Sequence, residues 1–434
     1  MLRCYRPVMH RSGGILFIVM VAVCGLLTAA PSARADNGYL GDFYLPPDPL
    51  PPGPPGEILR TEPSRIPAAV DFPAALPATA TRIMYRSTNA RGAAIPVTGT
   101  YIRPTLPWSG PGPRPLVSFA VGTHGQGDQC APSRLINEYL YQNRVLDTFL
   151  EYELLLVQRI IKRGWAVVVT DYEGLGTPGV HTYVNRLASG HAVLDAARAA
   201  RNLPDSGLDA AGPIALYGYS QGGAATASAA ELAAVYAPEL PIVGTYAGAP
   251  PADLSVMLPF LDGSAVAGIL GYVINSAIAS YPDYADAIHH ALTPDGEDLI
   301  AKTQNQCLGE TMANFMFRHN QRYFTVDTAV APTREPFKGL FEQQRIGRHK
   351  PAAPVLIVSN RYDPLVPYGP AAQLGRDWCA LGADAEFFTN EQPPLFNKLI
   401  VNHAFPIVVD AHRALEWVAD RFADRATTPN CGRF

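Results

Sequence analysis

The feature that most constrains this chain is a short motif near its middle, Gly218-Tyr219-Ser220-Gln221-Gly222. An apolar run at 214–217 leads into it, and a helix rich in small residues follows directly. A G-x-S-x-G between a strand and a helix predicts a sharp turn that holds the serine hydroxyl above the end of a sheet. The flanking positions must be small because the strand and the helix approach each other closely there. We therefore predict a nucleophile elbow with Ser220 at its tip, framed by Gly218 and Gly222.

Strands and helices alternate along most of the chain, and this alternation predicts a mostly parallel sheet with helices on both faces. The expected strands cover residues 81–87, 95–103, 115–121, 165–172, 214–217, 243–246, 354–359 and 385–389. The expected helices cover residues 190–203, 224–232, 370–381 and 406–422, and a long amphipathic region covers 133–163. Between about 251 and 350 the strand signals stop and the pattern becomes helical. We therefore expect an α/β core that a helical block interrupts.

The first 75 residues carry two further signals. Residues 1–35 combine a basic start, an apolar stretch and a small-x-small site, which together predict a cleaved signal peptide, with an uncleaved anchor as the alternative. Residues 36–75 are rich in proline and predict an extended arm or a loose linker. The expected organisation is a signal peptide (1–35), a Pro-rich arm (36–75), a first core part (76–250), a helical cap (251–350) and a second core part (351–434). We expect a secreted or cell-envelope-associated protein.

The number of cysteines also indicates an exported protein. Two of the six lie in the expected signal peptide, and the remaining four suggest two disulfides, for which three connectivities exist. We favour the pair Cys130–Cys307, which would tie the helical block to the core, and the pair Cys379–Cys431, which would tie down the C-terminus. The cysteine spacing does not fit a zinc site, and we expect no bound metal.

A serine hydroxyl is a weak nucleophile and needs a positioned base, which in turn needs an acid to orient it. Asp363 and His403 each follow a late strand, with His403 just before the expected last helix. The chain order Ser…Asp…His is that of α/β-hydrolases, so we predict Ser220 as nucleophile, His403 as base and Asp363 as acid. Two competitors are expected to have other roles. Asp171 follows an earlier strand and is expected to make structural hydrogen bonds, and His412 lies inside the last helix.

The glycine-rich loop at 122–127 is the expected second half of an oxyanion hole. Such a hole needs two backbone donors, and one should be the N–H of Gln221, directly after the serine. The other should come from Thr123 or His124, because this loop follows an early strand of the core. An ordinary flexible loop is the alternative. With these parts the expected chemistry is attack on an acyl carbonyl, an acyl-enzyme, and its release by water or an alcohol.

Longer stretches of the chain resemble the secretory lipase family of fungi and actinobacteria, and Gln221 after the serine resembles its bacterial branch. The segments that carry the resemblance are 122–133, 169–176, 218–222, 247–251 and 362–367. The resemblance implies an α/β-hydrolase core, a helical cap over the site, hydrolysis of carboxylic esters including acylglycerols, and no cofactor. It also makes the apolar stretch at 265–279 an acyl-facing wall, with a plain core helix as the alternative.

Charge and composition limit the classes of partner that we expect this protein to bind. The net charge is −4 and no run of Lys or Arg is present, so we expect no nucleic acid. The expected partner is a lipid or ester substrate, while contact with lipid aggregates and the oligomeric state stay open. Two other functions compete: an acyltransferase that uses the same acyl-enzyme, and a catalytically silent binding protein on the hydrolase fold.

Overall fold

A computed structural model of the chain describes residues 41–66, 77–138, 140–142 and 148–434. The expected signal peptide and part of the Pro-rich arm lie outside the described residues. The described residues belong to one compact unit, Gly38–Phe434. None of the helices in these described ranges has the length and apolar character needed to cross a membrane.

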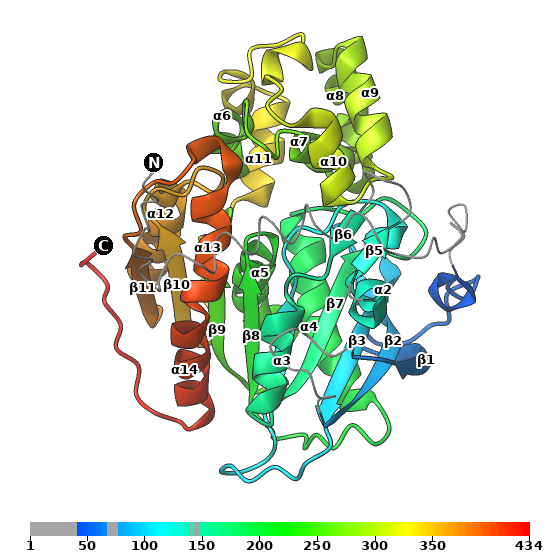
Figure 1. The fold of residues 1–434 in the computed structure, drawn as a ribbon, viewed down its shortest axis with the longest axis vertical. Coiled ribbons are helices and arrows are strands. Elements are labelled where there is room, and N and C mark those ends of the chain that lie inside the picture. The colour runs from blue at the N-terminus through cyan, green and yellow to red at the C-terminus, as the bar shows by residue number, and fades with distance from the viewer. Residues whose placement is uncertain (1–40, 67–76, 139, 143–147) are drawn as a thin grey trace, which may run out of the picture. The chain divides into compact units, whose positions relative to one another are not determined.

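A nine-stranded sheet forms the core, in the order β1-β2-β3-β7-β4-β8-β9-β10-β11 (Figure 1). The strands are β1 Ile58–Ser64, β2 Ala78–Thr88, β3 Ala94–Pro104, β4 Leu116–Ala120, β7 Ala166–Glu173, β8 Ile214–Tyr219, β9 Ile242–Gly248, β10 Val355–Asn360 and β11 Ala385–Asn390. β1, β2, β3 and β7 pair antiparallel, and all pairs from β7 to β11 are parallel. The expected mostly parallel sheet is confirmed. Its central strands are buried on both faces, which explains their continuous apolar runs.

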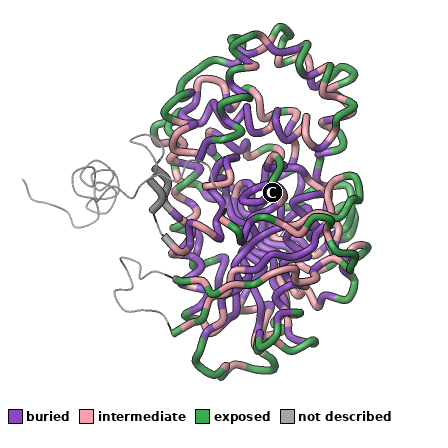
Figure 2. Tube along the Cα trace, turned by 90° about the vertical axis from the view of Figure 1, so that its right-hand side faces the viewer, coloured by how far each residue is buried: buried purple, intermediate pink, exposed green. Residues whose placement is uncertain are grey.

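Helices cover both faces of the sheet. α4 and α5 pack against each other and on one face, and α3 and α14 lie on the other (Figure 1). The core helices are α2 Pro132–Glu138, α3 Leu154–Lys162, α4 Arg186–Asn202, α5 Gln221–Tyr236, α12 Tyr368–Ala380, α13 Val401–Val409 and α14 Ala411–Phe422. The buried residues are concentrated along the sheet and the helices beside it (Figure 2).

A helical block lies between β9 and β10, at one end of the sheet (Figure 1). Its helices are α6 Leu258–Leu261, α7 Ile269–Ser280, α8 Ala285–Ala291, α9 Pro294–Thr303, α10 Leu308–Phe315 and α11 Phe337–Gln344, with short 3-10 turns η4 Leu254–Val256, η5 Pro282–Tyr284, η6 Asn320–Arg322 and η7 Ala331–Thr333. The block coincides with the stretch where strand signals stop.

Two disulfides fix distant parts of this unit, and their pairing is the one favoured from the sequence. Cys130–Cys307 joins the loop after β4 to the start of α10, across a sequence separation of 177 residues. Cys379–Cys431 joins α12 to the C-terminal segment.

Three elements differ from the sequence-based expectation. The Pro-rich arm contributes an edge strand, β1, which pairs with β2. The amphipathic region splits into α2, α3 and a small hairpin of β5 Leu140–Gln142 and β6 Thr148–Leu150. The single last helix that was expected is two helices, which are separated at Asp410. The first of them begins at Val401 rather than at Pro406. Proline favours the first position of a helix, which made Pro406 a misleading start signal.

Candidate active site

Ser220 occupies the turn between β8 and α5 with φ 57° and ψ −118°. A non-glycine residue with positive φ is strained, and the surrounding contacts must hold it there. Its N–H donates to the Gly248 carbonyl at 2.8 Å. A Cβ on Gly218 would lie 2.3 Å from the Gly222 carbonyl oxygen, and a Cβ on Gly222 would lie 2.0 Å from the Ala120 carbonyl oxygen. Both positions therefore need glycine, as the motif predicts.

The structure brings Ser220, His403 and Asp363 into one chain of hydrogen bonds. Ser220 Oγ lies 2.9 Å from His403 Nε2, and His403 Nδ1 lies 2.8 Å from Asp363 Oδ2. Because a carboxylate only accepts, Nδ1 carries the proton and Nε2 is left to accept from the serine hydroxyl. The other carboxylate oxygen of Asp363 accepts the N–H groups of Leu365 and Val366, both at 2.9 Å. The turn that follows β10 thus holds the Asp363 carboxylate in place.

His403 lies in the first turn of α13, and not before the last helix as expected. Its N–H donates to the Ile400 carbonyl at 3.0 Å, and Ile400 itself has a left-handed conformation. The Tyr219 hydroxyl donates to the His403 carbonyl at 2.8 Å. The residue before the serine therefore also positions the histidine.

Gln221 begins α5, so its backbone N–H is one of the donors that a helix leaves unpaired in its first turn. Its side-chain amide donates to His181 Nε2 at 3.0 Å. The other ring nitrogen of His181 donates to the Glu173 carbonyl at 2.9 Å. Burial lowers the pKa of His181 to about 4, so the ring is neutral and Nε2 can accept. The side chain of Gln221 is therefore fixed beside the elbow.

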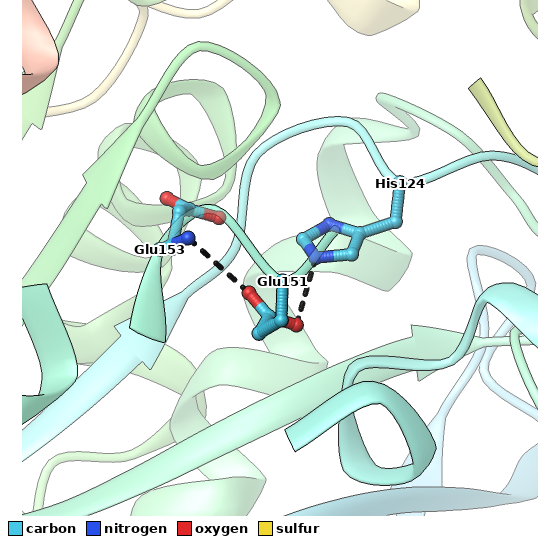
Figure 3. A group of neighbouring side chains, drawn as sticks. All are labelled: His124, Glu151 and Glu153. Carbon is cyan, nitrogen blue, oxygen red and sulfur yellow. Dashed lines mark hydrogen bonds and ion pairs between the residues drawn. The ribbon is translucent and has the colours of Figure 1, made fainter. Parts of the chain in front are cut away.

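The side chain of His124 is buried in a cluster with Glu151 and Glu153 (Figure 3). His124 Nδ1 donates to the Gly122 carbonyl at 3.0 Å, and Nε2 lies 3.0 Å from Glu151 Oε2. Burial alone would lower the pKa of His124, but the adjacent Glu151 carboxylate outweighs it and raises the pKa to about 9. Burial raises the pKa of Glu153 to about 8. At neutral pH the cluster therefore holds an imidazolium and an uncharged carboxyl.

Sequence reasoning missed both glutamates of this cluster. They precede an amphipathic helix, where an acidic residue usually faces solvent, so no local signal indicates their burial. The three side chains offer ligand atoms within 4.8 Å of one another and are, among the described residues, the group that could hold a metal ion.

An apolar cavity lies between the helical block and the core. The free space inside it is about 830 Å³, including the part open to solvent. One side of α7 lines it through Leu270, Val273, Ile274 and Ala277. Its core side is formed by residues 183–185, and the hydroxyl of Tyr183 lies 2.8 Å from Thr123 Oγ1. The cavity wall thus reaches the glycine-rich loop.

Asp171 and His412, the alternatives to Asp363 and His403 in the sequence, lie in other parts of the structure. Asp171 is buried and accepts hydrogen bonds from the Ser133 N–H at 2.8 Å and the Thr98 hydroxyl at 2.7 Å, which is the expected structural role. His412 lies in α14 with 83% of its side chain exposed. Neither residue belongs to the hydrogen-bond chain of Ser220.

Comparisons with known proteins identify the family and the fold of the chain. The sequence profile described as secretory lipase matches residues 141–430. A protein of Mycobacterium tuberculosis named a probable inactive lipase is 30% identical over 89% of this chain and 82% of its own length. A secreted triacylglycerol lipase of Malassezia furfur is 29% identical over 71% of this chain and 79% of its own length. In fold, the chain is similar to Candida antarctica lipase A in its closed state, with a TM-score of 0.76, 23% identity, and coverage of 92% of this chain and 90% of that one.

Replacing Gly222 by alanine tests the close approach at the elbow. The new Cβ would meet a backbone oxygen at 2.0 Å, so the helix or the strand must move. We expect a loss of about 3 kcal/mol or more in the free energy of unfolding, measured by urea denaturation. Gly369→Ala is the control, because a Cβ there has no atom within 4 Å. Equal stabilities of Gly222→Ala and the wild type would contradict the prediction.

Glu153→Gln tests the ionisation of the buried carboxyl. The pKa of Glu153 rises from 4.5 to about 8 on folding, so between these pH values the folded protein holds one proton more than the unfolded chain. Its stability must therefore fall as the pH rises through this interval, by at most about 1.4 kcal/mol per pH unit. The glutamine variant should lack this component, whereas the exposed Asp298→Asn should keep it. Denaturation across this interval measures the slopes, and identical slopes in the wild type and Glu153→Gln would refute the assignment.

Proposed function

Because the chain belongs to the secretory lipase family, we propose that it is a secreted serine hydrolase that cleaves carboxylic esters of lipids through an acyl-enzyme. Membership of this family supports activity as a lipase or esterase. The observation that carries the serine mechanism is the hydrogen-bond chain from Ser220 Oγ through His403 to Asp363. A strained serine at a helix N-terminus, held by backbone contacts on both sides, supports the same role.

In the proposed reaction His403 Nε2 takes the hydroxyl proton as Ser220 attacks the ester carbonyl. Asp363 stabilises the imidazolium that forms. The tetrahedral oxyanion is bound by the backbone N–H of Gln221 and by a second donor in the loop after β4, with Thr123 and His124 as the candidates. The imidazolium then gives its proton to the leaving alcohol. Water attacks the acyl-enzyme with His403 again as base, which releases the acid and restores the serine.

The apolar cavity is the proposed site of the acyl chain. Most of its lining residues are aliphatic or aromatic, and α7 supplies one wall. Ser220 is not among the lining residues, so the carbonyl end of the substrate would lie at the loop of Thr123 while the chain extends past Tyr183. A lipid ester fits such a division between a polar centre and an apolar chamber.

Secretion is supported by the family, by the secreted relative and by the two disulfides, which persist in oxidising compartments. The signal peptide at 1–35 belongs to the same proposal. A second candidate is a catalytically silent binding protein, because a relative with 30% identity is named a probable inactive lipase. The paired serine, histidine and aspartate favour the enzyme.

Ser220→Ala separates these two candidates. We expect a fluorophosphonate to label the wild type, which should also hydrolyse p-nitrophenyl esters. The variant should not be labelled, and its kcat should be about 10⁶-fold lower. Asp363→Asn should lose about 10⁴-fold, because the histidine tautomer is no longer fixed. Ser228→Ala, in the same helix, is the matched control and should be labelled normally. A folded wild type that takes no label and turns over no ester would leave the binding protein as the function.

Ala277→Phe tests the cavity as the acyl site. The larger side chain would occupy the chamber, so kcat/KM for long-chain p-nitrophenyl esters should fall about tenfold or more, with the acetate ester changed by no more than about twofold. Ala279→Phe is the control, because this residue lies on the same helix but does not line the cavity. A uniform loss on all chain lengths, or a loss equal to that of the control, would place the acyl chain elsewhere.

A further inference from the structure

The segment before α3 holds the loop after β4 through three contacts, one of which, between His124 and Glu151, is drawn in Figure 3. The three contacts are Gly122 N–H to Glu153 Oε2 at 2.7 Å, Tyr152 hydroxyl to Thr123 carbonyl at 3.4 Å, and His124 Nε2 to Glu151 Oε2 at 3.0 Å. Three consecutive residues thus fix three others in the glycine-rich loop. This loop is the part of the site where the second oxyanion donor is expected.

One of these contacts fixes the direction of a specific N–H group. The Gly122 carbonyl and the Thr123 N–H belong to one trans peptide, in which the two bonds point in opposite directions. The carbonyl oxygen accepts a hydrogen bond from His124 Nδ1 at 3.0 Å. The Thr123 N–H therefore points away from the imidazole. Within the described part of the chain, no residue accepts a hydrogen bond from it.

Thr123 is also tied to the residue that follows the serine. Its hydroxyl lies 2.8 Å from the Tyr183 hydroxyl, and the side chain of Gln221 donates to His181 at 3.0 Å. The segment 181–183 therefore contacts both residues and links the loop to the elbow. Two backbone N–H groups, one at the start of α5 and one in the loop, are thereby brought to the same end of the sheet.

Both ring nitrogens of His124 face hydrogen-bond acceptors, the Gly122 carbonyl and a carboxylate oxygen of Glu151. Both nitrogens therefore donate, while Glu153 accepts the Gly122 N–H. An imidazolium donates through both ring nitrogens, so one proton holds the loop carbonyl and the other holds Glu151. Burial strengthens both hydrogen bonds because water does not compete. The result is a rigid support for a single peptide plane.

On the basis of the ester hydrolysis proposed above, we infer that the backbone N–H of Thr123 is the second oxyanion donor and that His124, held by Glu151, is the positioning residue that aims it. His124 acts through the Gly122 carbonyl and does not touch the substrate. The side chain of His124, rather than its own N–H, is its contribution to the reaction.

Two amide substitutions of His124 separate the two ring contacts. In His124→Asn the amide nitrogen takes the place of Nδ1 and can still donate to the Gly122 carbonyl, but it cannot reach Glu151. In His124→Gln the amide nitrogen takes the place of Nε2 and keeps Glu151, but it releases the carbonyl. We expect kcat on p-nitrophenyl butyrate to be at least about tenfold lower in His124→Gln than in His124→Asn, with similar KM values. Inhibition by butylboronic acid, whose adduct on Ser220 is tetrahedral, should weaken in parallel with kcat.

Thermal unfolding of both variants separates positioning from stability. His124→Asn leaves a buried carboxylate without its partner and should be the less stable of the two. Activity and stability would then rank the variants in opposite orders, which a purely structural role of His124 does not produce. Equal kcat values, or a lower kcat in His124→Asn, would overturn the inference while the proposed function stands. A wild type without turnover or labelling would overturn both.

A crystal structure of the wild type with a p-nitrophenyl phosphonate adduct on Ser220 tests the donor without any variant. The phosphonyl oxygen should accept hydrogen bonds from the backbone N–H groups of Gln221 and Thr123, at about 2.7–3.1 Å. An oxygen bound instead by the His124 N–H, or by Gln221 alone, would overturn the assignment.

Discussion

The close approach of β4, β8 and α5 is the constraint on which the site depends. At Gly218 and Gly222 backbone meets backbone so closely that a methyl group would overlap a carbonyl oxygen, and at Gly223 it would lie 2.1 Å from the Gly248 carbonyl oxygen. Because interiors are packed to crystal-like density, such contacts leave the turn no room to relax. Ser220 therefore keeps its strained backbone and presents its hydroxyl at a fixed height above the sheet.

Residues far apart in the sequence meet here because the carboxyl ends of parallel strands, and the loops that follow them, lie at the same end of the sheet. Loops after β4, β8 and β10 bring Thr123, Ser220 and Asp363, and α13 adds His403 across 183 residues of chain from the serine. The loop after β4 differs from the other two in its support. It is held on one side by hydrogen bonds to the buried side chains of Glu151 and Glu153, and on the other by backbone hydrogen bonds to the helical block.

Much of the fold and the three central residues could be predicted because their signals are local. The sequence itself contains these signals: an apolar run, a glycine motif and the chain order. Ser220, Asp363 and His403 each follow such a signal. Glu151 and Glu153 carry none, since their burial results from how a distant loop packs on them. The same holds for β1, whose place in the sheet depends on its partner strand, and for α13, where Pro406 indicated a later start.

The fastening of the helical block to the core limits how that block can move. The disulfide at Cys307 is accompanied by hydrogen bonds from the Leu308 N–H to the His124 carbonyl at 2.8 Å and from the Gln126 N–H to the Gln306 carbonyl at 3.0 Å. Separating the block from the core at this point would break a covalent bond. Cys307 thus adds a third covalent connection to the two that the chain itself makes, after β9 and before β10. Any displacement of this part of the block would pull directly on the loop that carries Thr123.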